Sequence, residues 1–403
     1  MTAQFGLGAR GGSVVLHGVG PDLRAHEAVY GPLPLLDAAA LVDRLRRSGL
    51  TGRGGGAFPA WRKLQTSAEQ GHRPLVVANA SEGEPWSGKD RALLDTAPHL
   101  VLDGLAVLGS SLHARDLVLV AAPERFETIR AAAAQRTDGG SHVRLVPAAG
   151  RYVGGEASAA AALVRGRRAL PSDRRVPLAT RGPGGAPTFL SNVETIAEIA
   201  LVARFGGDWF RALGVDGTGG IRLVSITGDV RRPQVREVRS GVRLGDLIAL
   251  ARPDRPAAAI LGGLGGSWVR ADRWDVSYAD AALAAIGARP GAGVIRVVGA
   301  GRCPLRLTSR ILHRLAAESA GQCGPCVFGL PALAAAFDEV VRLGDASAAV
   351  ARVDDLAGEV SGRGMCHHPD GAAALVRSTL GVWWDHLEQH RRGRCDLEWE
   401  KSA

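Results

Sequence analysis

The chain has 403 residues, of which 46% are hydrophobic and 22% charged, so we expect several folded domains and little disorder. The formal net charge is +9, but no basic run alternates with aromatic residues, which excludes nucleic acid as the expected partner and favours an acidic protein surface. No apolar run approaches the roughly 20 residues that cross a bilayer, and no secretory signal is evident, so we expect a cytoplasmic protein without direct membrane insertion.

Residues 35–214 alternate predicted strands with predicted helices. The glycine-rich residues 1–34 before them are expected to form an irregular lead-in. Apolar runs predict strands at 74–80, 116–122 and 142–147. Helices are predicted from residue 35, at 98–114 and 123–136, from about 156 and from 191. This alternation predicts an α/β domain with a parallel sheet.

The pattern changes after the glycine-rich segment 214–220, which we interpret as a linker. A small α+β module is predicted over 215–302, with strands at 221–230, 235–238 and 293–298 and a helix at 244–251. The residues from 303 to 403 have a helical pattern, and a bundle is predicted from four helices at 305–319, 329–343, 345–361 and 370–390.

The loop GRGGGAFP (52–59) can place backbone N–H groups around a phosphate, because glycine permits close approach. Lys63 follows and could reach the same phosphate as a point charge. The alternative is an ordinary turn, since the chain contains 54 glycines. Lysine and asparagine are rare in this chain, with three and two residues, and the positions of Lys63, Lys89, Asn79 and Asn192 in candidate segments are therefore informative.

The segment ANASEGEPWSGKDR (78–91) follows a predicted strand and carries several polar side chains. Ligand sites in parallel sheets lie at the carboxyl ends of strands, where this segment is expected. Asn79 and Glu82 have groups that could bond a polar ring edge, and Glu84 could meet a ribose or an amide. The alternative is a solvated loop that caps the next helix.

Two further segments carry helix starts. RYVGGEASAAAALVRG (151–166) has a Gly-Gly-Glu turn before a helix of small residues, which a tight turn with close packing also explains. SNVET (191–195) is a capping box that explains Ser191 and Glu194 but leaves Asn192 without a role.

Cys323 and Cys326 in ESAGQCGPCVFGL (318–330) and Cys366 in GRGMCHHPDG (362–371) are candidate metal ligands. An iron–sulfur cluster usually takes four thiolates. Zinc would take three cysteines and a histidine, and His367 and His368 are adjacent. The third alternative is that these cysteines are small buried apolar residues.

The other two of the five cysteines, Cys303 and Cys395, lie in no motif, and we expect them to be incidental. The odd count and the absence of a secretory signal argue against a disulfide framework.

Taken in order, these segments resemble the family of flavin- and NADH-binding subunits of respiratory complex I and of related hydrogenases and formate dehydrogenases. The family pattern is G-R-G-G-A-G-F-P with a following Lys, N-A-D-E-G-E-P…K-D-R, C-G-E-E, N-N-V-E-T, and E-S-C-G-x-C-x-P-C with a late Cys. Here the counterparts are GRGGGAFP with Lys63, NASEGEPWSGKDR, GGEA, SNVET, and ESAGQCGPC with Cys366.

The resemblance covers about residues 35–385. It implies a Rossmann-like FMN domain, a small ubiquitin-like β-grasp module of the SLBB type and a C-terminal four-helix iron–sulfur domain. These domains would correspond to residues 35–214, 215–302 and 303–403.

The resemblance also implies the site residues, with Glu82 and Glu84 at the reacting centre. The FMN phosphate region would be held by Gly52, Arg53, Gly54 and Lys63. The flavin would be lined by Asn79, Glu82, Gly155, Glu156, Asn192 and Thr195. The nicotinamide dinucleotide would meet Phe58 and Glu84, and a [4Fe–4S] cluster would be ligated by Cys323, Cys326 and Cys366.

The implied activity is that of an NADH dehydrogenase-type flavoprotein, in which hydride passes from NADH to FMN and electrons leave through the cluster. The acceptor would be a partner redox protein, such as a [2Fe–2S], thioredoxin-like or ferredoxin-like subunit, or a quinone-reducing membrane complex. The chain would then be part of a hetero-oligomer, in the cytoplasm or peripheral at the inner face of the membrane.

The chain departs from the family pattern at several positions. Ala320 stands where the family has its first cluster cysteine. Other replacements are Ser81 for Asp, Ser191 for Asn and Ala157 for Glu, and expected aromatic residues are missing at Thr66 and in 174–179. These changes favour an alternative: an electron-relay or scaffold subunit that keeps the fold without NADH turnover. A zinc-stabilised helical domain on a nucleotide-binding protein is a third interpretation.

Overall fold

The computed structural model describes residues 12–395 and 397, apart from residues 19, 72 and 173–175. The predicted lead-in and the segment 174–179 therefore lie partly outside the described residues. Within the described part, the lead-in contains a helix, α1 (Leu23–Tyr30), where irregular structure was expected. Asp22 starts this helix by accepting the N–H of Ala25, and burial of Tyr30 anchors it.

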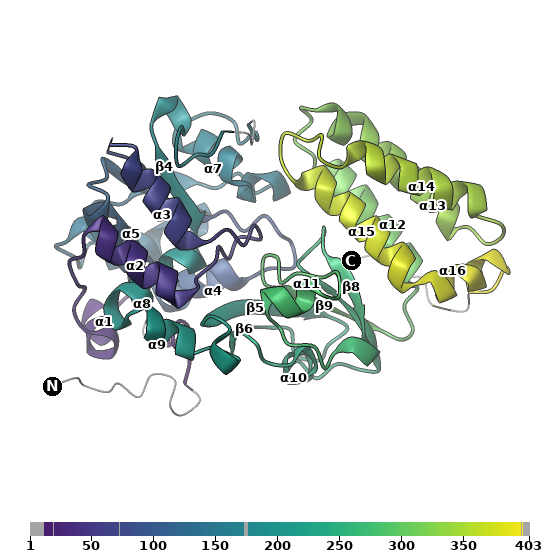
Figure 1. The fold of residues 1–403 in the computed structure, drawn as a ribbon, viewed down its shortest axis with the longest axis horizontal. Coiled ribbons are helices and arrows are strands. Elements are labelled where there is room, and N and C mark those ends of the chain that lie inside the picture. Colours follow the sequence, from purple (N-terminus) through teal and green to yellow (C-terminus); the bar gives the residue numbers. More distant parts are fainter. Residues whose placement is uncertain (1–11, 19, 72, 173–175, 396, 398–403) are drawn as a thin grey trace.

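A four-stranded, all-parallel sheet forms the core of the first region (Figure 1). Its strand order is β3-β2-β1-β4. The strands are β1 (Leu75–Ala80), β2 (Asp116–Ala121), β3 (Arg144–Pro147) and β4 (Thr188–Asn192). The prediction of a mixed α/β fold with a parallel sheet is confirmed. Strand β4 was not predicted, because TFLSN is short and runs directly into a helix.

Helices cover both faces of this sheet. Val76 and Ala78 of β1 pack in one apolar cluster with α5 and α8, whereas Leu75 and Val77 pack in another with α7. A strand buried on both faces needs a continuous apolar run, which is why this strand was recognisable in the sequence. The helices of this region are α2 (Ala38–Ser48), α3 (Ala60–Glu69), α4 (Lys89–Thr96), α5 (Pro98–Ser111), α6 (Phe126–Ala133), α7 (Ala157–Val164), α8 (Val193–Phe205) and α9 (Gly207–Ala212).

The second region is a five-stranded mixed sheet with the order β6-β5-β9-β7-β8. The central pair β5 and β9 is parallel, and the other pairs are antiparallel. Two of its strands, β7 and β8, were not predicted, since β7 is rich in alanine and β8 has only four residues. The elements are β5 (Ile221–Gly228), β6 (Gln234–Arg239), α10 (Leu244–Leu250), β7 (Pro256–Leu261), β8 (Ser267–Arg270), α11 (Asp280–Ala284) and β9 (Val294–Gly299).

The C-terminal region is helical, as predicted, and its helices stand side by side in Figure 1. The expected helix 370–390 is broken at Trp383, so that α16 is a separate short helix. A five-residue π-helical turn, Pro325–Gly329, carries Cys326. The helices are α12 (Pro304–Ala317), α13 (Leu330–Val341), α14 (Ser347–Val360), α15 (His368–Val382) and α16 (Trp384–Arg391).

In the part of the chain that the structure describes, no single helix is long and apolar enough to cross a bilayer. Helices α4 and α5 pass that test only as a pair, and a bend of 93° separates them.

Candidate cofactor sites

The carboxyl ends of β1 and β4 lie side by side, with Asn79 opposite Asn192 in the register. Nδ2 of Asn79 donates to the carbonyl of Gly155 at 3.0 Å, and Nδ2 of Asn192 donates to the carbonyl of Asn79 at 3.2 Å. Asn192 also caps α8 by accepting the N–H of Glu194. A Cβ on Gly54 would lie 3.3 Å from that of Asn192, so the glycine-rich loop reaches the same edge. The sheet therefore brings together three of the segments predicted to bind flavin.

Lys63, on α3, reaches this edge as a largely buried amine. Its Nζ donates to the carbonyl of Leu190 at 2.8 Å and lies 5.9 Å from the centre of the Phe189 ring. Burial lowers the pKa of Lys63 to about 8. Among the described residues no carboxylate forms an ion pair with this amine, which has three donors. It is suited to receive an anion.

Arg53 uses its guanidinium inside the protein. Nε donates to Glu198 at 2.8 Å, and an Nη atom donates to the carbonyl of Ile221 at 2.9 Å. Its backbone N–H donates to Oγ1 of Thr195 at 2.9 Å, and the N–H of Gly52 donates to the carbonyl of Phe58. Arg53 and Thr195 thus fix the loop to α8 and β5. A phosphate role for this loop has to rest on the N–H groups after Arg53 and on Lys63.

Lys89 lies at the centre of a buried polar network that the predicted site did not include. Its Nζ contacts Asp90 at 2.6 Å, Asn192 at 2.8 Å and Glu194 at 2.9 Å. Burial alone would lower the pKa of Lys89, but the two carboxylates raise it. The rarity of lysine in this chain and the K-D-R of the family pattern were the sequence signals for it. This network holds Asn192 in place through a second bond, from its Nδ2 to Asp90 at 2.7 Å.

Glu82 adopts a positive φ of 35° and turns its carboxylate toward the start of α4. The carboxylate accepts the N–H groups of Asp90 at 2.9 Å and Arg91 at 3.0 Å, and the hydroxyl of Ser87 at 2.8 Å. The helix-capping alternative for this loop is therefore what the structure shows for Glu82.

Glu84 links the first region to the second. One carboxylate oxygen accepts the N–H of Leu264 at 2.9 Å, and the other accepts that of Trp86 at 3.3 Å. Burial raises the pKa of Glu84 to about 7, although both N–H groups act to lower it. Gly263 has a φ of +102°, which favours glycine, and a Cβ there would lie 2.2 Å from this carboxylate. A carboxyl group of this kind can change its charge near neutral pH.

The Gly-Gly-Glu turn packs directly on the segment that carries Glu82 and Glu84. A Cβ on Gly83 would lie 2.5 Å from the carbonyl oxygen of Tyr152, which leaves room only for glycine. Glu156 starts α7 by accepting the N–H groups of Ser158 at 2.8 Å and Ala159 at 3.0 Å. The predicted flavin-lining residues Gly155 and Glu156 thus have clear structural roles, and their contact with flavin stays a prediction.

The three predicted cluster cysteines are near enough for the thiols of Cys323 and Cys366 to act on that of Cys326. Burial, followed by the neighbouring thiols of Cys323 and Cys366, raises the pKa of Cys326 to about 12. Burial also raises the pKa of Cys366. Buried thiols with raised pKa values become thiolates when a metal binds them. The donor set fits an iron–sulfur cluster with three cysteine ligands, which leaves one further ligand to be supplied.

The cluster segment lies against the Gly-Gly-Glu turn. Arg151 donates to the carbonyl of Ser319 at 3.0 Å, and the N–H of Tyr152 donates to Glu318 at 3.2 Å. The rings of Tyr152 and His368 meet edge to face at 5.2 Å. Contacts between residues 151–152 and 318–319 therefore join the predicted flavin edge to the predicted cluster.

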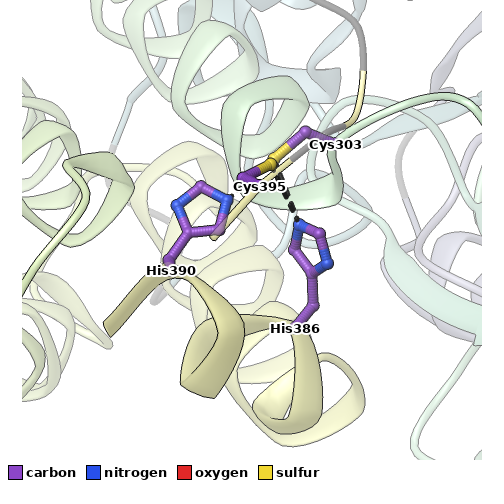
Figure 2. Close-up of side chains that lie close together, drawn as sticks. All are labelled: Cys303, His386, His390 and Cys395. Atoms are coloured by element: carbon purple, nitrogen blue, oxygen red, sulfur yellow. Dashed lines mark hydrogen bonds between the residues drawn. The ribbon is translucent and has the colours of Figure 1, made fainter. Parts of the chain in front are cut away.

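Cys303 and Cys395, which we expected to be incidental, form a second group with two histidines (Figure 2). The Sγ atom of Cys303 lies 3.4 Å from Nε2 of His386 and 3.4 Å from Nε2 of His390. The Sγ atom of Cys395 lies 3.8 Å from Nε2 of His386. The prediction for these two cysteines is therefore wrong, because the break at Trp383 folds α16 back over the start of α12. A recognisable signal was present in the two histidines four residues apart with a cysteine five residues later.

Comparison with known proteins gives two family matches in the predicted order. Residues 45–201 match the Nuo51 FMN-binding domain, and residues 306–390 match the NADH-ubiquinone oxidoreductase-F iron-sulfur binding region. An NADH-quinone oxidoreductase subunit of Streptomyces coelicolor is 29% identical over 403 residues, covering 94% of this chain and 90% of the relative. An NADH-quinone oxidoreductase subunit of Rhizobium meliloti is 28% identical over 376 residues, covering 87% and 89%.

Two solved structures have a similar fold. Both are structures of NAD+-reducing [NiFe]-hydrogenase. The H2-reduced state has a TM-score of 0.79 and 28% identity to this chain, and the air-oxidized state has a TM-score of 0.78 and 26% identity. They cover 90% and 91% of this chain, and the chain spans 64% of each hydrogenase chain.

A parallel α/β domain that matches an FMN-binding family, joined to a helical region that matches an iron–sulfur family, defines a flavin and iron–sulfur redox subunit. The chain belongs to the family of flavin- and NADH-binding subunits of respiratory complex I and related hydrogenases, as its motifs predicted.

Proposed function

We propose that this chain is the NADH-oxidising subunit of a multi-subunit redox complex. The observation that carries the proposal is the contact of residues 151–152 with residues 318–319, which supports a proposed FMN edge close to the predicted cluster cysteines. When bound, FMN accepts a hydride from NADH, and the cluster accepts its electrons one at a time. The protein orients the two groups and excludes water between them.

Lys63 would neutralise the FMN phosphate at the edge formed by β1 and β4. Asn79 and Asn192 would fix the ring system, because Asn192 is held by the buried network around Lys89 and Asn79 by the carbonyl of Gly155. Phe58 is 50% exposed, so its ring is available to stack against a dinucleotide. Glu84 would face the nicotinamide side with a carboxyl group that is half ionised near neutral pH.

We also assign the five-stranded module to the ubiquitin-like β-grasp fold of the SLBB type, and helices α12 to α15 to the iron–sulfur bundle. The support for the first is the parallel central pair β5 and β9 between antiparallel strands. The support for the second is that the cluster cysteines lie on links between these helices.

Exposed apolar side chains mark where a redox partner would dock. Val327, Phe328 and Met365 are 40%, 76% and 38% exposed, and each is next to, or two residues from, a cluster cysteine. Electron transfer to another protein of the complex requires a short path from the cluster, which this surface would provide. We infer a hetero-oligomer in which the redox partner contacts residues 327, 328 and 365.

The proposal is tested by an absorption spectrum of the anaerobically purified chain, reconstituted with FMN, before and after addition of NADH. Bleaching of the flavin by about one equivalent of NADH is expected. Thr66, at a position where the family has an aromatic residue, favours a second candidate, a relay or scaffold subunit without NADH turnover. That candidate predicts bound flavin that dithionite bleaches and NADH does not.

A further inference from the structure

We propose that Cys303, His386, His390 and Cys395 bind a single structural zinc ion, separate from the iron–sulfur cluster. The four ligand atoms come from three parts of the helical region: the residue before α12, two successive turns of α16, and the segment after α16. All four lie within 4.8 Å of one another. Figure 2 shows the four side chains converging on one point.

The distances match one tetrahedral ion. Bonds of about 2.3 Å to sulfur and about 2.05 Å to nitrogen at tetrahedral angles put sulfur and nitrogen about 3.6 Å apart. The observed sulfur–nitrogen distances are 3.4, 3.4 and 3.8 Å. A two-iron cluster would separate the thiolates from the imidazoles, because the two pairs bind different irons. Two cysteines and two histidines around one point are the ligand set of structural zinc.

The second ring nitrogen of His390 supports this assignment. Its Nδ1 lies 2.9 Å from the carbonyl oxygen of Val341, the last residue of α13. A carbonyl only accepts, so Nδ1 carries the proton and the Nε2 lone pair faces Cys303. Metal-binding histidines are commonly oriented in this way by a carbonyl. The ring is fully buried, and so the orientation is fixed before metal arrives.

Charge balance also favours a divalent ion. Zinc binding releases one proton from each thiol, and two thiolates then neutralise the ion inside a mostly buried site. Cys303, His386 and His390 are 3%, 7% and 0% exposed, which a neutral site tolerates. With four protein ligands no coordination position is open to substrate, so the role is structural. The ion would pin α16 and the following segment to α12 and α13.

The site is far from the cluster. Cys303 precedes α12 and the cluster segment follows it, and 14 helical residues span about 21 Å. Zinc and iron can therefore be lost independently, and the zinc proposal does not rest on NADH oxidation.

The test is the metal content of the full chain, purified from cells grown with added zinc, with zinc and iron assayed together. One zinc per chain is expected. Cys303→Ala and His390→Ala should each lose that zinc with iron unchanged, and Cys326→Ala should lose iron with zinc unchanged. His313→Ala is the matched control, since this exposed histidine on α12 pairs with Asp338 instead; it should keep both metals.

A second measurement covers the case in which the variants do not fold. Cobalt added to the zinc-depleted wild-type chain should give the visible bands of a tetrahedral ion with thiolate ligands. A wild-type chain without zinc or cobalt binding would overturn the proposal. So would a disulfide between Cys303 and Cys395 in non-reducing peptide mass analysis, or zinc retention in both site variants.

Discussion

Lys63 is a buried amine whose described partners are one carbonyl and one aromatic ring. Its position beside the glycine-rich loop is why we propose that it neutralises the FMN phosphate. A charged hydrogen bond contributes about 1.5–3 kcal/mol, so this single side chain would have a measurable share of FMN binding.

We predict that Lys63→Ala weakens FMN binding about ten- to a hundredfold, by the loss of one charged hydrogen bond. The dissociation constant is measured by flavin fluorescence on the apoprotein. Arg62→Ala is the control, because Arg62 is an exposed neighbour on the same helix. Equal affinity in the Lys63 and Arg62 variants would remove Lys63 from the site.

The lowered pKa of Lys63 predicts how FMN affinity depends on pH. The free amine is protonated below about pH 8 and neutral above it. Phosphate binds the protonated form better, so affinity should be nearly constant between about pH 7 and pH 8, where the phosphate is a dianion, and fall up to about tenfold per unit above pH 8. Lys63→Arg should abolish this dependence, since arginine stays charged. A fall in affinity that persists in the arginine variant would contradict the assignment.

Ala320 leaves the cluster one cysteine short, and His368 is the candidate replacement. Among the described residues, Nδ1 of His368 is buried without a hydrogen-bond partner, while Nε2 is 2.7 Å from the carbonyl of Leu315. We predict that His368→Ala lowers iron content and that Ala320→Cys in the same chain restores it. Iron analysis and low-temperature EPR of the reduced protein provide the measurement. Full iron content in His368→Ala would point to an external ligand.

At the scale of single residues the sequence predicted where functional groups gather, but less of what each one does. Asn79 and Asn192 meet at one sheet edge because parallel strands end there together, and Lys63 reaches β4 from α3 at Leu190. Arg53 bonds Glu198, which is 145 residues away along the sequence, and no local sequence pattern contains such a contact. The same is true of the group formed by Cys303, His386, His390 and Cys395, in which Cys303 contacts His390 across 87 residues of sequence.

Helices α5 and α8 approach so closely that one glycine decides their packing. A Cβ on Gly104 would lie 2.0 Å from the carbonyl oxygen of Ile196. Both helices are almost entirely buried between the sheet and the outer helices. This packing positions the start of α8, where Asn192 and Thr195 lie.

We predict that Gly104→Ala lowers the free energy of unfolding by about 3 kcal/mol, because the added methyl group overlaps backbone. Gly358→Ala is the matched control on α14, where nothing lies within 4 Å of the added methyl. It should be neutral or stabilising by up to about 1 kcal/mol. Urea unfolding curves compare the two, and equal midpoints would contradict the packing described here.

Elements with a continuous apolar run or a strong helical period were predictable, as β1 and α12 show. Strand β4 was missed because its five residues run into α8 without a turn, and β7 because alanine gives no strand signal. The end of the last predicted helix at Trp383 was also missed. That break has no proline or glycine at the residue itself, so the sequence carries no stop signal at that position.

Several of the contacts that join the three regions of the molecule lie around the proposed flavin edge. Arg53 reaches β5, Glu84 reaches the loop after β7, and Arg151 reaches the cluster segment. The proposed site would therefore depend on all three regions.

At the scale of the whole molecule, we predict that Phe328→Asp slows electron transfer to the redox partner at least tenfold. Flavin bleaching by NADH should be unchanged. A charge at an exposed apolar side chain beside the cluster would weaken docking without disturbing the flavin edge. Leu250→Asp, at a 49% exposed position at the end of α10, is the control. Reduction of the co-purified partner is followed by stopped-flow absorbance. Equal rates in both variants would place the docking surface elsewhere.

The most direct test of the central claim is whether electrons from NADH reach the cluster within this chain. The anaerobic protein, loaded with FMN and iron, is mixed with less than one equivalent of NADH, and flavin absorbance and the EPR signal of the reduced cluster are recorded together. We predict that both change, with the cluster signal appearing after the flavin bleaches. The claim would be contradicted by a flavin that bleaches while the cluster stays oxidised. Dithionite must reduce the same cluster in a parallel sample, which shows that the cluster is intact.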